Sequence, residues 1–60
     1  MHFRDQRVAR ILMIYYIAKI EKGDSSYLPP LKELYQQVAK MRYLDSKTRD
    51  TLLRAQQTLG

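Results

Sequence analysis

The chain has 60 residues and no cysteine, so it lies near the lower size limit for a domain that folds without a disulfide or a thiolate metal site. Eleven Lys and Arg against six Asp and Glu give a net charge of +5, and a sequence pI of 9.8 is typical of proteins with nucleic-acid or other anionic partners. The composition predicts one small domain, residues 1–60, and excludes a disulfide-stapled scaffold.

The first predicted element is a long helix over residues 4–22, which contains neither Gly nor Pro and stops at Gly23. We expect four residues of this helix to face the core: Val8, Ile11, Leu12 and Tyr15. Five other apolar residues point elsewhere around it: Met13, Ile14, Tyr16, Ile17 and Ile20. Because its middle is apolar on nearly every side, two short helices cannot cover it completely.

Pro29 and Pro30 open the second predicted helix, with Pro30 at the first helical position, where no backbone donor is needed. Its apolar residues follow at i, i+3, i+4 and i+7: Leu31, Leu34, Tyr35 and Val38. The segment KMRYLDS then breaks the pattern, and we expect Tyr43 and Leu44 to plug the corner before the next helix.

The third predicted helix begins after a cap at Asp45 or Ser46 and continues to about Leu59. Its narrow core stripe has spacings of four, three and four: Thr48, Leu52, Ala55 and Leu59. Lys47 and Arg49 occupy its first turn, where the helix dipole is positive and cations are unfavourable. No useful β-pattern is present, so the predicted fold is all-α, with three helices.

The sequence gives little support for catalysis or for cofactor binding. The acids are scattered, so no acid and base pair can be assigned, and neither Ser25 nor Ser26 has a nucleophile motif or a nearby histidine. His2 is the single histidine, and it has no ligand cluster around it. We therefore expect a protein that is not an enzyme and that binds no metal, cofactor or small-molecule substrate.

The apolar run from Ile11 to Ala18 is too short to span a bilayer, and the N-terminal segment lacks a signal-peptide cleavage site. The sequence therefore predicts a cytoplasmic protein that does not contact membranes.

Two short helices joined by a tight corner and braced by a longer one indicate a helix-turn-helix, whose second helix enters the major groove of DNA. The phosphate backbone would then compensate the cations at the start of helix three. The predicted DNA-binding residues are Ser46, Lys47, Arg49, Asp50, Thr51, Arg54 and Gln57. The alternative is an ordinary solvated face, with Asp50 and Arg54 forming an i,i+4 pair.

The segments ILMIYYIAKIEKG, YLPPLKELYQQVA and LDSKTRDTLLRAQQTLG resemble the N-terminal domain of LexA-type winged-helix repressors over about residues 8–60. The resemblance implies recognition-helix contacts at Ser46, Lys47, Arg49, Asp50 and Arg54. Leu28 is inserted after Tyr27, the corner after helix two is longer and lacks a glycine, and the chain ends where a β-wing would begin. These departures affect the rotation expected for helix three.

The sequence thus predicts a small, sequence-specific transcription regulator that binds double-stranded DNA. We expect a homodimer, because four apolar residues of helix one would otherwise be left in water: Met13, Tyr16, Ile17 and Ile20. In the alternative to self-association, the N-terminal residues and residues 23–30 fold back over helix one, with Tyr27 and Leu28 as lids. An alternative function is that Ile14, Tyr16, Ile17 and Ile20 dock on a host protein as an inhibitor or adaptor. RNA is a third possible partner, although the sequence contains no strand-borne aromatic platform.

Overall fold

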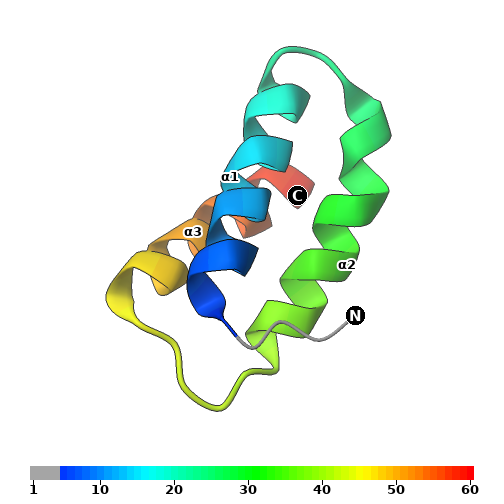
Figure 1. The fold of residues 1–60 in the computed structure, drawn as a ribbon. Coiled ribbons are helices and arrows are strands. Elements are labelled where there is room, and N and C mark those ends of the chain that lie inside the picture. The colour runs from blue at the N-terminus through cyan, green and yellow to red at the C-terminus, as the bar shows by residue number, and fades with distance from the viewer. Residues whose placement is uncertain (1–4) are drawn as a thin grey trace.

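The computed structural model describes residues 5–60, and it consists of three packed helices and a short 3₁₀ turn. The helices are α1 (Gln6–Glu21), α2 (Leu28–Ala39) and α3 (Ser46–Leu59), and the turn η1 (Ser25–Tyr27) joins the first two. α1 and α2 run in opposite directions, while α3 crosses behind α1 (Figure 1). Each helix packs against the other two, and residues 5–60 contain no strand. The predicted all-α, three-helix fold is confirmed; His2 and Arg4 lie outside the described residues.

The turn after α1 depends on Gly23, whose φ of +100° is in the left-handed region. The backbone N–H of Gly23 donates to the carbonyl of Ile20 at 2.9 Å, and that of Asp24 donates to the carbonyl of Lys19 at 3.0 Å. This pair of bonds is a Schellman motif, which satisfies carbonyls at the helix end that have no N–H donor within the helix. Gly23 therefore ends α1 as the sequence predicts.

The other two helices differ slightly from their predicted starts. α2 begins at Leu28 rather than at Pro30, so both Pro29 and Pro30 lie inside its first turn. Backbone nitrogens of a first turn have no acceptor within the helix, so neither proline costs a hydrogen bond there. α3 begins at Ser46, and the Asp45 carboxylate accepts a hydrogen bond from the N–H of Thr48 at 2.7 Å. Asp45 is therefore the cap.

The core lies between the three helices and is small. Its fully buried apolar residues are Ala9, Met13, Ile17, Leu31, Leu34, Val38 and Ala55. The apolar face predicted for α2 is the one that packs inward, with Tyr35 at its edge. The predicted stripe of α3 is also confirmed: Thr48 and Ala55 are buried, and Leu52 and Leu59 pack against the core.

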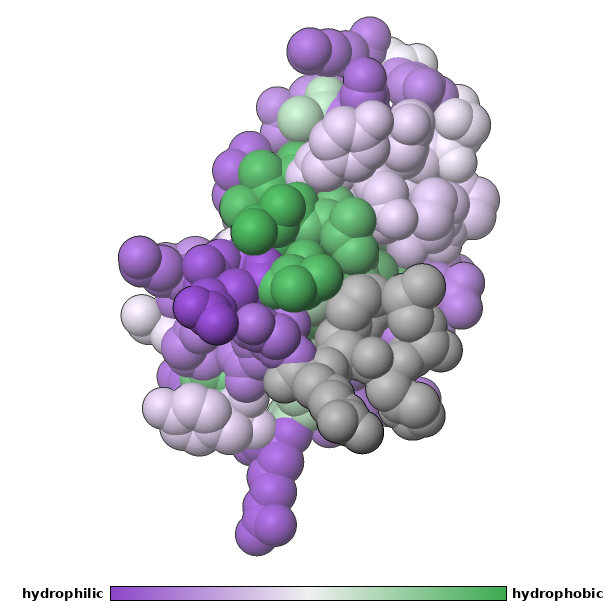
Figure 2. All heavy atoms as spheres, viewed as in Figure 1, coloured by the Kyte–Doolittle hydropathy of each residue, from purple (hydrophilic) through white to green (hydrophobic). Residues whose placement is uncertain are grey.

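The face predicted for the core side of α1 is wrong at three of its four residues, and only Leu12 packs against the core as predicted. Val8, Ile11 and Tyr15 are 49%, 62% and 48% exposed, whereas Met13 and Ile17 are 0% and 1% exposed. An apolar surface consequently remains over α1, visible as the green region of Figure 2.

The same correction applies to the predicted dimer interface. Met13 and Ile17 are enclosed within a single chain, so neither can meet a second copy. Tyr16 and Ile20 are half-buried and pack against the core. Tyr16 also lies against Tyr27 of η1, with ring centroids 5.6 Å apart, so the fold-back of residues 23–30 holds in part.

Two features fix the rotation of α1. Ala9 lies at the centre of the buried face and has no side chain beyond Cβ, so neighbouring helices can approach closely there. At the start of the helix, the side-chain amide of Gln6 donates to the carbonyl of Tyr43 and accepts from the N–H of Asp45 at 3.2 Å. Because Gln6 is on the same face as Ala9, this clamp turns that face towards the corner before α3.

Candidate nucleic-acid interface

Four cations lie along the segment from the end of α2 to the first turn of α3, and we call this segment, residues 40–49, the cationic corner. They are Lys40, Arg42, Lys47 and Arg49, and Asp45 is the one acid of this segment. All four cations are exposed, and none of them forms an ion pair within residues 5–60. Their charge is therefore presented to solvent along the loop and at the two helix ends that it joins.

The carboxylate of Asp45, the acid of this segment, makes two structural contacts. It caps α3 through the N–H of Thr48, and one of its oxygens lies 3.7 Å from Nη1 of Arg10 in α1. The hydrogen bond from Thr48, with smaller contributions from Arg10 and Lys47, lowers the pKa of Asp45 below its ordinary value. The carboxylate stays ionised near neutral pH and joins the start of α3 to α1.

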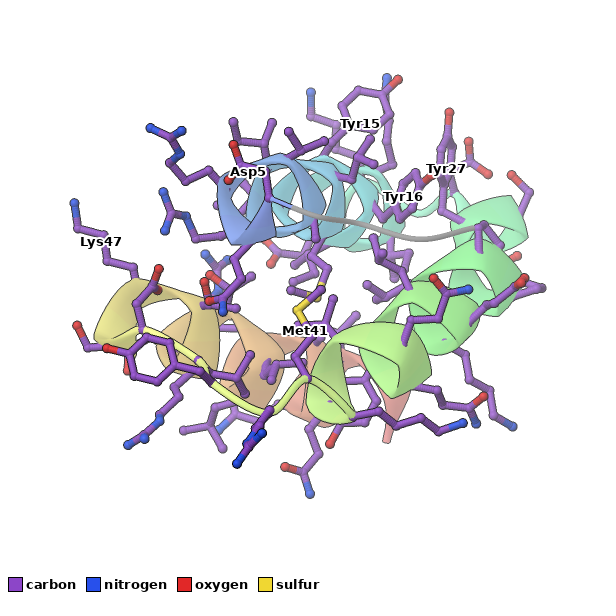
Figure 3. All side chains as sticks on the ribbon, turned by 60° about the horizontal axis from the view of Figure 1, so that its bottom comes forward. Asp5, Tyr15, Tyr16, Tyr27, Met41 and Lys47 are labelled. Carbon is purple, nitrogen blue, oxygen red and sulfur yellow. The ribbon has the colours of Figure 1, made fainter. Side chains whose placement is uncertain are left out.

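The first turn of α1 lies beside the cationic corner and adds further arginines to this end. Asp5 caps α1 by accepting the N–H of Arg7 at 2.9 Å, and its other oxygen lies 3.1 Å from Nη2 of Arg7. These hydrogen bonds lower the pKa of Asp5 and raise that of Arg7. Figure 3 shows Asp5 and Lys47 at the same end of the molecule.

Six of the seven residues predicted to contact DNA are exposed on α3: Ser46, Lys47, Arg49, Asp50, Arg54 and Gln57. The seventh, Thr51, is only 6% exposed, and its hydroxyl donates to the carbonyl of Lys47 at 3.0 Å. Its predicted role is wrong, because a side chain that points into the domain and bonds its own helix cannot reach a phosphate.

The two cations of the first turn lie on opposite flanks of α3. Lys47 and Arg49 are two positions apart, which corresponds to about 200° around an α-helix. Ser46 and Asp50 lie between them on the outermost face. A ligand approaching this face would therefore meet a cation on each side.

Arg54 is held by α1 rather than by its own helix. Its Nη2 lies 3.2 Å from a carboxylate oxygen of Glu21, and both side chains are exposed. The i,i+4 pair between Asp50 and Arg54, which belonged to the alternative of a solvated face, is absent from the described ion pairs. To read a base, Arg54 would first have to leave Glu21, which is a small cost for an exposed pair.

Sequence reasoning missed one exposed aromatic residue in the cationic corner. Tyr43 was expected to plug the corner, but it is 76% exposed and lies next to Arg42 in the chain. Leu44 packs against the core as predicted, and so does Met41, which Figure 3 shows between the helices. The charged residue on one side of Tyr43 was the available signal that this position faces solvent.

Comparisons with protein-family models, with curated proteins and with solved structures found no match. The resemblance to LexA-type domains therefore stays a prediction. Within residues 5–60, no helix is both long and apolar enough to cross a membrane. The described part of the chain also contains no group of three or more His, Cys, Asp or Glu placed to hold a metal ion.

Proposed function

We propose that this chain binds duplex DNA through the cationic corner, with the first turn of α3 directed at the phosphate backbone. The observation that carries the proposal is a set of four exposed cations that form no ion pair within residues 5–60: Lys47 and Arg49 in the first turn of α3, and Lys40 and Arg42 in the segment that leads to it. Lys47 and Arg49 oppose the dipole of α3, at a cost of about 0.3–1 kcal/mol for each unfavourable charge near a helix end. A phosphate in front of this turn would reverse that effect, because it interacts favourably with both the dipole and the side chains.

Tyr43 and Arg42 extend the same surface into the loop before α3. A phenolic hydroxyl and a guanidinium both donate to phosphate oxygens, which receive half to two-thirds of the hydrogen bonds in protein–DNA interfaces. This arrangement supports backbone contacts from the loop and the first turn of α3 together.

Base reading would come from residues further along the exposed face of α3. Arg49 has the planar fork that pairs with guanine, and Gln57 has the amide that pairs with adenine. Arg54 joins them once it leaves Glu21. In this proposal the protein is a small transcription regulator, and a homodimer places two α3 helices on two half-sites.

The second candidate function is protein docking through α1, and it rests on a different observation. The exposed apolar residues of α1 are Val8, Ile11, Ile14 and Tyr15. Of the residues predicted to dock, Ile14 belongs to this surface, whereas Ile17 is buried and Tyr16 and Ile20 are half-buried. Docking of this kind buries apolar area and does not release counterions, so it depends weakly on salt.

Fluorescence anisotropy of a labelled random duplex separates the two functions. We expect binding at micromolar affinity or tighter at about 50 mM salt. Four phosphate contacts give a slope of about −3.6 in log K against log salt, so affinity should fall roughly a hundredfold between 50 and 200 mM salt. If no anisotropy change occurs at low salt, the cationic corner does not bind DNA, and docking through α1 becomes the better proposal.

A further inference from the structure

The apolar stripe of α1 is the exposed face formed by Val8, Ile11, Tyr15 and Ala18, with Ile14 at one edge. Its members are separated by three, four and three residues, which is the 3.5-residue spacing of a seam between two paired helices. We propose that a second copy of this chain covers the stripe, with the two α1 helices antiparallel. The proposal concerns self-association and does not depend on DNA binding.

The charges beside the stripe identify the occupant and its direction. One edge carries Arg7, Ile14 and Glu21, each seven residues from the next. The other edge carries Leu12, which also packs against the core, and Lys19, and Asp5 in the cap before α1 continues the same spacing. In an antiparallel pair, Val8 faces Ala18 of the second copy, and Ile11 faces Tyr15 of the second copy. Each edge then meets the same edge of the other chain.

In the antiparallel arrangement, each charged residue on an edge faces a residue of opposite charge on the same edge of the second copy. Arg7 faces Glu21 of the second copy, Asp5 faces Lys19 of the second copy, and both pairs occur twice because the two-fold axis repeats them. Ile14 meets its own counterpart near the axis. The chain is therefore complementary to itself in both apolar pattern and charge.

A parallel pair lacks this complementarity. In a parallel seam, each residue of one edge faces the residue five positions later on the opposite edge of the other chain. Arg7 would then face Leu12, and Ile14 would face Lys19. Two cations would be placed against aliphatic side chains, and no opposite charges would pair.

Arg7 and Glu21 already form ion pairs within one chain, and these pairs do not prevent them from pairing with the second copy. Arg7 is 75% exposed beside Asp5, and Glu21 is 58% exposed beside Arg54. Exposed pairs such as these are weak and easily shared. We infer that burial of the stripe provides the affinity and that the charges select the antiparallel direction.

The direction has a further consequence, which rests on the proposed function. α3 contacts α1 on the side of Arg10 and Glu21, through Asp45 and Arg54. The two-fold axis of an antiparallel pair is perpendicular to both α1 helices, so these sides face the same way in both copies. Both α3 helices would then lie on one face of the dimer, where one duplex could meet them.

Single cysteines test the pairing directly, because the chain has none of its own. We expect Ile14→Cys copies to be joined efficiently by a short bismaleimide, since the two residues meet at the axis. The two copies of Val8→Cys should remain unjoined, because ten residues of helix separate them, or about 15 Å. Leu53→Cys, an exposed position on α3, measures random collision. Preferential joining of Val8→Cys would show a parallel pair, and joining of Ile14→Cys no faster than of Leu53→Cys would overturn the proposal.

Sedimentation of charge variants gives an independent test in the absence of DNA. Arg7→Glu alone and Glu21→Arg alone each place like charges opposite one another, so each should self-associate roughly tenfold more weakly than the wild type. An equimolar mixture should recover association, because both opposing pairs are again opposite in sign. Circular dichroism confirms that each variant is folded. A wild-type chain that sediments as a monomer at hundreds of micromolar, or a mixture no stronger than its components, would refute the antiparallel dimer.

Discussion

The orientation of α1 can be tested by making the same substitution at two positions of that helix. Ile17 is 1% exposed and Ile11 is 62% exposed, so Ile→Val removes one methyl group from the core in the first case and from the surface in the second. Ile17→Val should cost about 0.5–1.5 kcal/mol. Ile11→Val should change stability by less than about 0.5 kcal/mol. Helix propensity does not confuse the comparison, because Ile and Val have similar values.

Urea or thermal unfolding followed by circular dichroism provides the measurement. A domain of this size is stabilised by only about 3–9 kcal/mol, and 1 kcal/mol shifts the midpoint by about 4–8 °C, so the expected difference is readily resolved. The protein should be at low micromolar concentration, because self-association through the stripe would add a concentration-dependent cost to Ile11→Val. Equal losses at both positions, or a larger loss for Ile11→Val, would show that α1 is rotated differently.

Four further substitutions test separate features of the structure and the proposed interface. Gly23→Ala should lower the free energy of unfolding by about 1–2 kcal/mol, because the residue holds a left-handed conformation; urea unfolding would show this. The pKa of Asp45 is lowered in the folded protein, so the ionised carboxylate contributes its full stabilisation of the fold above the unfolded-state pKa of about 3.9. This contribution is lost as the pH falls through the folded-state pKa. Asp45→Asn, which retains a good cap, should therefore make the free energy of unfolding less dependent on pH below about 4. Lys47→Ala should reduce the salt slope of DNA binding by about one unit on every DNA sequence. Arg54→Ala should weaken binding by about 1–3 kcal/mol on a preferred site only. Equal losses of affinity on preferred and random DNA in both variants would exclude base reading by α3.

The sequence is sufficient to predict α2 and α3 because each has one apolar face. In α2 the pattern beginning at Leu31 allows one inward orientation, and that orientation is observed. In α3 the stripe from Thr48 to Leu59 is equally restrictive, and the cap at Asp45 fixes the start of the helix. A narrow apolar stripe on an otherwise polar helix leaves little freedom of rotation.

The rotation of α1 could not be predicted in the same way, because Ile11 and Ile17 are equally apolar and lie about 120° apart around the helix. The deciding contacts are non-local: Gln6 bonds the backbone near Asp45, almost forty residues away. The burial of Thr51 could not be predicted for a local reason. Its hydroxyl donates to the carbonyl of Lys47 in its own helix, so this polar side chain can be buried without a partner from elsewhere. Periodicity alone cannot detect either arrangement.

The most direct test of DNA binding through the cationic corner compares two charge-matched double variants by anisotropy with a labelled duplex. Lys47→Gln with Arg49→Gln removes two charges from the start of α3, and Lys22→Gln with Lys32→Gln removes two exposed charges elsewhere. We expect the first variant to lower the salt slope by about two units and to weaken binding roughly tenfold or more at about 50 mM salt. The second variant should bind nearly as the wild type does. Equal losses in the two variants would mean that net charge alone attracts DNA, and would contradict a defined interface at the cationic corner.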